Sequence, residues 1–220
     1  MTIVSVKTGN EKPGAGKGFR QIEFSDGTFF TFNVCYLSPG NESLYAPGAA
    51  EGLEISAADA EDIRFASACL RAETAALRLI ARAEQNTFGL TRKLEKRGHD
   101  SVNIRTAISR LCDLNLLDDR RYARLWLESR LNCRATSPRR LLVSLCARGV
   151  DRDDAEFALA KVLDDEGELT LLGRFAQKIK RKQKNAGDDR RPLSYLLKSE
   201  GFSSRAVQRF FEDQQAEGVV

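Results

Sequence analysis

Two kinds of hydrophobic spacing divide the chain near residue 55. Before this point apolar and polar residues alternate in short runs, as where Phe30 and Phe32 alternate with Phe29 and Thr31. Alternation with a period of two is the pattern of a half-buried β-strand. From Ser56 onwards, apolar residues recur every three or four positions, as on amphipathic helices. The sequence therefore predicts a β-rich beginning followed by helices.

The β-rich beginning covers residues 1–54. Its apolar runs predict strands at Ile3–Val6, Phe19–Phe24 and Thr28–Tyr36, and Ser25-Asp-Gly27 joins the last two. Asp-Gly between β-branched and aromatic runs favours a hairpin. Because the segment is small, we expect an appended hairpin or small sheet and not an enzyme domain.

A glycine-rich stretch, Pro13–Gly18, superficially resembles a phosphate-binding loop. A Walker loop needs glycine where this chain has Glu11, and Ser or Thr after the lysine where it has Gly18. It also needs a helix to follow, whereas a strand is predicted here. We interpret the stretch as a hairpin loop.

A joint that ends one helix and starts the next occurs three times in the helical part. In each copy a leucine stands four residues before a glycine, and Asp or Ser follows two residues after it. Glycine can adopt the left-handed conformation of a Schellman stop, and Asp or Ser caps the next helix. The joints contain Leu94, Gly98 and Asp100, then Leu145, Gly149 and Asp151, then Leu197, Gly201, Phe202 and Ser203.

The joints lie inside three units of similar length, each with three predicted helices. We expect a linker helix and first repeat at 55–118, a second repeat at 119–166, a third at 167–214, and a tail at 215–220. The expected fold is mainly α: three tandem three-helix repeats in an elongated array, preceded by a small β-rich N-terminal segment. Repeats of this kind bury apolar faces against one another and expose long binding surfaces.

The net charge of +4 is unevenly distributed. Residues 1–54 and 55–74 each carry more acidic than basic side chains, whereas the remaining residues carry a large basic excess. Positive charge therefore gathers on the repeats. Such a balance favours a polyanionic partner, either nucleic acid or a nucleoprotein surface.

Neither catalysis nor a metal site is indicated. His99 is the one histidine, it occupies a helix-joint position, and the paired carboxylates Asp118-Asp119 and Asp153-Asp154 stand at predicted helix starts. We expect no catalytic residue, no metal and no cofactor. No C-x-x-C occurs, so neither zinc nor a disulfide framework is supported. We expect reduced, mostly buried thiols at Cys35, Cys69, Cys112, Cys133 and Cys146.

No signal peptide and no apolar span long enough for a bilayer is visible in the sequence. We therefore expect a cytoplasmic protein that has no membrane partner, and we expect a monomer.

Clusters of basic residues recur in corresponding helices. A single cluster is often only a solvated face, but recurrence favours a continuous basic surface that follows a phosphate backbone or an acidic protein groove. Short helices with a glycine turn leave a second hypothesis open, a helix-turn-helix-like module that binds DNA directly. The candidate contact residues are Arg92, Lys93, Arg97, Arg121, Arg124, Arg139, Arg140, Arg148, Lys178, Lys180, Arg181, Lys182 and Lys184.

Five short motifs together resemble the RecX family over residues 75–212. They are Ala76–Arg82, Leu94-x-x-x-Gly98, Leu116-Leu-Asp-Asp-x-x-Tyr122-Ala, Leu145-x-x-x-Gly149-Val150 and Tyr195-Leu-x-x-x-x-Gly201-Phe202. The resemblance implies a helical protein of three repeats that binds the RecA recombinase filament. It implies further that RecA's DNA-dependent ATPase and strand exchange are modulated, most often inhibited. DNA, single- or double-stranded, would be contacted directly or through the filament.

The chain departs from the family pattern in two places. Ala83–Thr87 replaces an Arg-Glu-x-Ser motif, and Cys133–Thr136 lacks the glycine that the family favours there. Both differences concern the loop or contact surface, so they bear on the sign and strength of regulation and not on the fold.

Overall fold

The computed structural model describes residues 2–8, 18–41, 45, 52–185 and 192–216. They form two compact units, which are described separately. The first comprises Met1–Glu84 with Leu90–Leu117, and the second comprises Gln85–Gly89 with Asp118–Val220. The helical class and the small N-terminal sheet predicted from the sequence are both confirmed.

The sheet of the first unit contains β1 (Ile3–Thr8), β2 (Phe19–Phe24) and β3 (Phe29–Asn33), antiparallel and in that order. The predicted hairpin joins β2 to β3. Its Asp26 Oδ1 accepts a 2.9 Å hydrogen bond from the amide of Thr28, and Gly27 has a φ of 79°. Of the glycine-rich loop, residues 13–17 lie outside the described residues.

The third strand is shorter than predicted. It ends at Asn33, and a 3-10 helix, η1 (Val34–Tyr36), follows. The change occurs because Asn33 Oδ1 accepts a 3.1 Å hydrogen bond from the amide of Cys35, which turns the backbone out of the sheet. The turn brings Tyr36 to the helix that packs on the sheet, where its hydroxyl donates a 2.8 Å hydrogen bond to Glu73.

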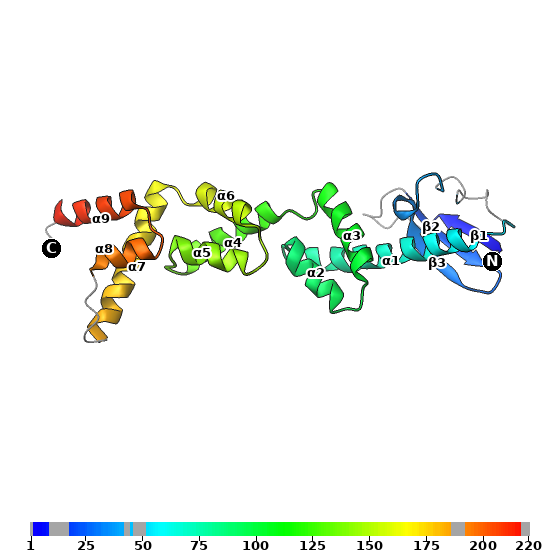
Figure 1. The fold of residues 1–220 in the computed structure, drawn as a ribbon, viewed down its shortest axis with the longest axis horizontal. Coiled ribbons are helices and arrows are strands. Elements are labelled where there is room, and N and C mark those ends of the chain that lie inside the picture. Colours follow the sequence, from blue (N-terminus) through cyan, green and yellow to red (C-terminus); the bar gives the residue numbers. More distant parts are fainter. Residues whose placement is uncertain (1, 9–17, 42–44, 46–51, 186–191, 217–220) are drawn as a thin grey trace. The chain divides into compact units, whose positions relative to one another are not determined.

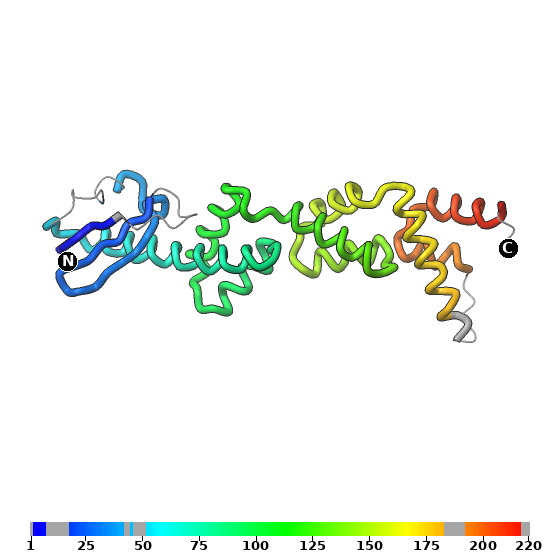
Figure 2. Tube along the Cα trace, turned by 180° about the vertical axis from the view of Figure 1, so that it is seen from behind, coloured from blue at the N-terminus to red at the C-terminus, as the bar shows by residue number. Residues whose placement is uncertain are grey.

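That helix, α1 (Ala57–Ile80), crosses one face of the sheet (Figures 1 and 2). Ser56 caps it, and Ser56 and Asp59 form a reciprocal capping box. Ala60 and Ala66 face the sheet, and their small side chains allow close approach of helix and strands. The β-rich segment therefore shares its core with α1.

The first unit is completed by α2 (Thr87–Glu95), whose first residues belong to the second unit, and α3 (Ser101–Asp113). Leu90 and Leu94 of α2 pack against Ile104 and Leu111 of α3 in a separate core. All four side chains are fully or almost fully buried.

The second unit contains six helices among its described residues (Figure 1). One core joins the first three, centred on Leu127, Leu141 and Leu145, and another joins the last three, centred on Leu172 and Leu197. The helices are α4 (Asp119–Cys133), α5 (Pro138–Cys146), α6 (Arg152–Val162), α7 (Asp165–Asn185), α8 (Leu193–Ser199) and α9 (Ser204–Ala216).

Each glycine joint has the hydrogen bonds of a Schellman stop. At the second joint, Val150 N donates to Leu145 O (3.2 Å) and Gly149 N donates to Cys146 O (2.8 Å). Equivalent bonds occur at the other two joints. The glycine φ angles are 80°, 85° and 90° at Gly98, Gly149 and Gly201. These are left-handed conformations that residues with a Cβ resist.

One expectation about exposure is wrong. Cys35, Cys133 and Cys146 are exposed, so the thiols are not mostly buried. Tyr195 is 59% exposed although its neighbours on α8 are apolar.

None of the helices that the structure describes is long and apolar enough to cross a bilayer.

Candidate functional site

A basic surface of the second unit starts between α4 and α6. Arg120, Arg121 and Arg124 extend from α4, Lys161 extends from α6, and together they line a hollow of about 600 Å³. Asp118 caps α4, because its Oδ1 accepts hydrogen bonds from the amides of Arg120 and Arg121. The helix therefore starts where three arginines fall in its first two turns.

An exposed aromatic ring lies in this hollow. Phe157 of α6 is 50% exposed. The guanidinium of Arg120 lies 5.2 Å and Nζ of Lys161 lies 5.6 Å from its ring centroid. Arg120 also donates from Nε to Asp154 Oδ1 at 2.6 Å, and this hydrogen bond raises the pKa of the guanidinium. A half-exposed ring flanked by cations can stack on a base or hold an apolar side chain of a charged partner.

The hollow continues along the second unit. A second hollow, about 380 Å³, shares Glu128 and Val162 with the first. It ends at Arg174 of α7, which also lines a third hollow of about 250 Å³ with Lys178, Arg181 and Lys182. We call these three adjoining hollows the basic groove. Its cations are Arg120, Arg121, Arg124, Lys161, Arg174, Lys178, Arg181 and Lys182.

Helical geometry gathers the cations of α7. Lys178, Arg181 and Lys182 follow Arg174 at four, seven and eight residues, spacings that fall on one face of a helix. Two of them also hold the end of α4: Arg174 Nη1 donates to Leu131 O at 3.1 Å, and Lys178 Nζ to Ala135 O at 3.4 Å. The positive side chains therefore complement the negative end of the α4 dipole.

The charge along the groove is strongly unbalanced. Of the described side chains that line it, eight are cationic, and only Asp118 and Glu128 are anionic. Arg124 lies 3.8 Å from Glu128, both are exposed, and such a pair contributes little to stability. This arrangement can hold a run of phosphates or carboxylates, because guanidinium groups bind both in a bidentate manner.

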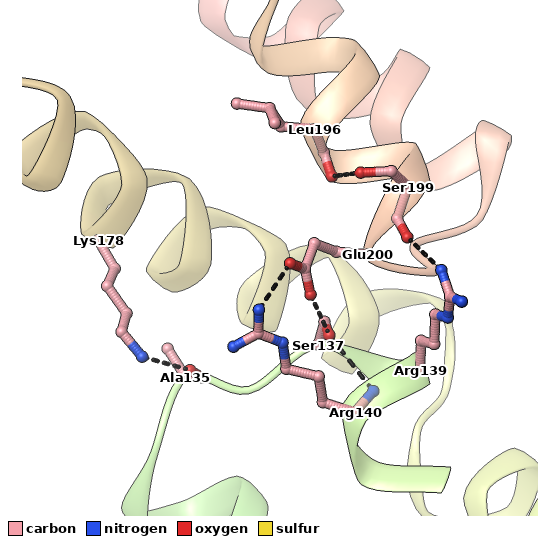
Figure 3. A network of polar contacts seen from close by, with 8 residues as sticks. All are labelled: Ala135, Ser137, Arg139, Arg140, Lys178, Leu196, Ser199 and Glu200. Carbon is pink, nitrogen blue, oxygen red and sulfur yellow. Dashed lines mark hydrogen bonds and ion pairs between the residues drawn. The ribbon is translucent and has the colours of Figure 1, made fainter. Parts of the chain in front are cut away.

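Two predicted contact residues on α5 instead bind the end of α8. Arg140 Nη2 lies 2.9 Å from Glu200 Oε1, and Arg139 Nη1 donates to Ser199 O at 3.1 Å (Figure 3). Ser137 Oγ donates to Glu200 Oε2 at 2.9 Å while it caps α5. Arg139 and Arg140 therefore do not line the basic groove.

Two further predicted residues, Arg148 and Lys180, also lie away from the groove lining. Arg148 donates to Ser144 O at 2.8 Å, and its guanidinium lies 4.7 Å from the Trp126 ring centroid. Lys180 donates to Gln214 on α9 at 3.4 Å, on another side of α7. Lys184 belongs to α7, but its side chain lies outside the described residues.

Arg92, Lys93 and Arg97 belong to the first unit, on α2 and the joint after it, and all three are exposed. They are therefore not among the lining residues of the basic groove.

The candidates selected from the sequence omit Arg120, Lys161, Arg174 and Phe157. Arg120 adjoins the selected Arg121, whereas the other three are single residues outside a basic run, so clustering along the chain could not select them. Helical spacing could have selected Arg174, which stands four residues before Lys178.

Two glycine joints of the second unit also contact residues that stand at the start of another helix. Ser137, the cap of α5, bonds Glu200, the residue before Gly201. In the same manner Asn86 Nδ2 donates to the carbonyl of Arg148, the residue before Gly149, at 2.7 Å. A Cβ on Gly201 would lie 2.6 Å from Arg139 Cβ, and one on Gly149 would overlap Phe88. Nothing lies within 4 Å of a Cβ built on Gly98.

Comparison with known proteins supports one family. The family model of the RecX second three-helix domain matches residues 118–159, a segment that contains α4, α5 and most of α6. The chain is 37% identical over 145 residues to the regulatory protein RecX of Treponema pallidum (strain Nichols). The aligned residues are 66% of this chain and 86% of that protein. The chain belongs to the RecX family.

A second RecX relative, from Halorhodospira halophila, is 33% identical over 139 residues, or 61% of this chain and 82% of that protein. A crystal structure of regulatory protein RecX matches with a TM-score of 0.72 and 19% identity, covering 96% of this chain and 98% of that chain. RecX from Lactobacillus salivarius matches with a TM-score of 0.57 and 21% identity, covering 68% and 97%. These structural likenesses show the RecX fold.

Proposed function

We propose that this RecX family member is a non-enzymatic regulator of homologous recombination that binds the RecA–DNA filament. The observation that carries the proposal is the basic groove, which extends over helices of two successive three-helix groups. Its target is a polyanionic surface, either the DNA of the filament or the acidic side chains of RecA. The expected consequence is inhibition of RecA's ATPase and strand exchange.

The groove's chemistry fits binding. Its cations present N–H donors, and the half-exposed Phe157 provides a stacking face. A groove of this kind binds by charge and shape. Catalysis would need a nucleophile activated by nearby titratable side chains, or a bound metal ion. Among the residues that the structure describes, no group of His, Cys, Asp and Glu side chains could hold a metal ion.

In this proposal the repeats at 119–166 and 167–214 act as one binding body. The Ser137–Glu200 and Arg140–Glu200 contacts hold the two in register, so that the α4–α6 hollow and the cationic face of α7 adjoin. Binding would occur in the cytoplasm, where the filament forms, and needs a single copy of the chain.

Co-sedimentation with RecA filaments on single-stranded DNA tests the proposal. Wild type should pellet with the filament at stoichiometric ratio. A variant carrying Arg121→Glu, Arg124→Glu, Arg181→Glu and Lys182→Glu should stay in the supernatant with unchanged far-UV circular dichroism. Lys180→Glu, on another side of α7, is the matched control and should pellet like wild type. Pelleting of the four-site variant would contradict the proposal.

The helix-turn-helix-like alternative receives less support. The third helices of the two groups in this unit, α6 and α9, would have to enter the major groove. Two of their arginines lie in exposed ion pairs, Arg152 at 2.8 Å from Glu156 and Arg209 at 2.6 Å from Glu166. Sequence-preferring binding to duplex DNA without RecA would favour this alternative. Binding that is non-specific and falls with salt would not.

A further inference from the structure

The first unit has a groove of its own, between the edge of β3 and one side of α1. Its volume is about 600 Å³. We call it the edge groove. It is lined among others by Phe29 and Thr31 of β3, by Leu70, Arg71 and Arg78 of α1, and by His99 of the joint after α2.

The backbone of β3 is open on the side away from β2. β3 is the last strand of the sheet. Thr28 O accepts from Phe24 N at 2.8 Å and Val34 N donates to Gly18 O at 3.0 Å. In an antiparallel ladder the groups of alternate residues point the same way, so the N–H and C=O groups of Phe29 and Thr31 point away from β2. Within the described residues these outward groups form no hydrogen bond.

An open edge of this composition is a hazard for a free protein. Residues Phe29–Asn33 carry no charge and no proline, and Phe29 is 66% exposed. Natural sheets protect such edges with lysine, proline, a bulge or a cover. This edge has neither lysine nor proline, and we therefore favour a strand from a partner protein as its cover.

The charge of the edge groove selects the partner. Arg71 and Arg78 lie on the same side of α1, two turns apart, and none of the lining side chains that the structure describes is acidic. Leu70, a buried side chain, adds apolar character to the lining. A complementary ligand therefore carries carboxylates and apolar side chains on an extended backbone.

We propose that the edge groove binds an extended acidic segment of a partner protein, which joins the sheet beside β3 as a fourth strand. A peptide fits better than single-stranded nucleic acid, because a peptide backbone alternates donors and acceptors along a strand edge, whereas a phosphodiester chain offers no donor. The site is separate from the basic groove, so either proposal can fail alone.

Fluorescence anisotropy with the full chain tests the site. The probes are a labelled decapeptide of alternating valine and glutamate, its valine–lysine counterpart, and an oligothymidylate of similar length. We expect the acidic peptide to bind roughly tenfold more tightly than the basic one. Preference for the basic peptide, for the oligothymidylate, or for none of the three would overturn the proposal.

Two pairs of variants separate strand addition from simple charge attraction. Thr31→Pro removes an outward N–H that the β2 ladder does not use, so the sheet should persist while peptide binding is lost. Thr31→Val keeps that N–H and should bind. Arg71→Glu with Arg78→Glu should weaken binding about tenfold. Arg64→Glu, an exposed residue of α1 outside the groove, should not.

Sedimentation of the free protein shows whether a second copy of the chain, and not a peptide, occupies the edge groove. Edge-to-edge pairing of two copies would give wild type a concentration-dependent dimer that Thr31→Pro abolishes, and this would overturn the proposal. Equal peptide binding by Thr31→Pro and Thr31→Val would overturn it as well. A monomer with Thr31-dependent peptide binding is the result we expect.

Discussion

Gly201 lies against Arg139, so closely that a Cβ built on the glycine would lie 2.6 Å from the Cβ of the arginine. Gly149 has the same relationship to Phe88, whose side chain a Cβ would overlap. In both cases a residue at the start of one helix lies against the glycine joint that ends another helix. The glycines therefore serve two purposes: they permit a left-handed φ and they leave room for this close contact.

Substitutions of the joint glycines should consequently differ in cost. Gly98→Ala meets only the left-handed strain and should cost about 1–2 kcal/mol. Gly201→Ala adds a steric overlap with Arg139 and should cost roughly 2–5 kcal/mol. Urea unfolding followed by circular dichroism measures both. Equal losses in the two variants would contradict a packing role for Gly201.

Two tyrosines of the first unit should respond in opposite ways to loss of the hydroxyl. Tyr36 donates to Glu73, a carboxylate only 7% exposed that Arg110 also approaches at 3.4 Å. Tyr36→Phe removes one hydrogen-bond donor of that buried carboxylate and should lower the free energy of unfolding by about 1–3 kcal/mol. The Tyr45 hydroxyl is buried and forms no hydrogen bond with the described part of the chain. Tyr45→Phe should therefore be neutral or stabilising.

Thermal denaturation of the two variants at neutral pH decides this prediction. A loss in Tyr45→Phe equal to that in Tyr36→Phe would show that hydroxyl burial, and not the contact with Glu73, sets the effect.

Stability of the first unit should fall at alkaline pH. Burial raises the pKa of the Cys69 thiol from 9.0 to about 11 and that of Tyr45 from 10.0 to about 12. Burial, followed by the hydrogen bond to Glu73, raises the pKa of Tyr36 as well. The unfolded chain loses these protons first, so their contribution is full below about pH 9 and is lost as pH rises towards the folded-state values.

Urea midpoints measured at increasing pH test this dependence. Cys69→Ala should flatten the decline between about pH 9 and pH 11, where the thiol titrates in the unfolded chain but not in the folded one. A variant curve parallel to that of wild type would exclude the thiol as a cause.

The sequence predicted the local structure well wherever a backbone rule decided it. Glycine four residues after leucine specified the three Schellman stops, and Asp-Gly specified the β2–β3 hairpin. It failed at the end of the third strand, where a local hydrogen bond from the Cys35 amide to Asn33 Oδ1 starts η1. It also failed where a distant contact decided the outcome, because no local pattern indicated that Tyr36 would contact Glu73, 37 residues away.

The candidate site was only partly predictable for the same reason. Arg121, Arg124, Lys178, Arg181 and Lys182 do line the basic groove. Arg139 and Arg140 stand in an equally basic run, yet Glu200 and Ser199, 60 residues away, engage them. Which cations face a groove depends on helix rotation and on partners that adjacent sequence does not reveal.

The two sides of α7 should contribute differently to binding of single-stranded DNA. Arg181→Glu with Lys182→Glu removes two groove cations, so the slope of log K against log salt should fall by about 0.7 for each phosphate that the variant no longer neutralises. Lys180→Glu changes a residue that donates to Gln214 and should leave the slope nearly unchanged. Anisotropy titrations at several salt concentrations give both slopes. Equal slopes in the two variants would place the DNA-binding surface elsewhere.

The most direct test of the central claim is RecA's ATPase on single-stranded DNA, titrated with this protein. Wild type and Lys180→Glu should lower the rate at stoichiometric ratio. The variant with Arg121→Glu, Arg124→Glu, Arg181→Glu and Lys182→Glu should leave the rate close to that of RecA alone. An unchanged rate with wild type, or equal inhibition by the four-site variant, would contradict regulation through the basic groove.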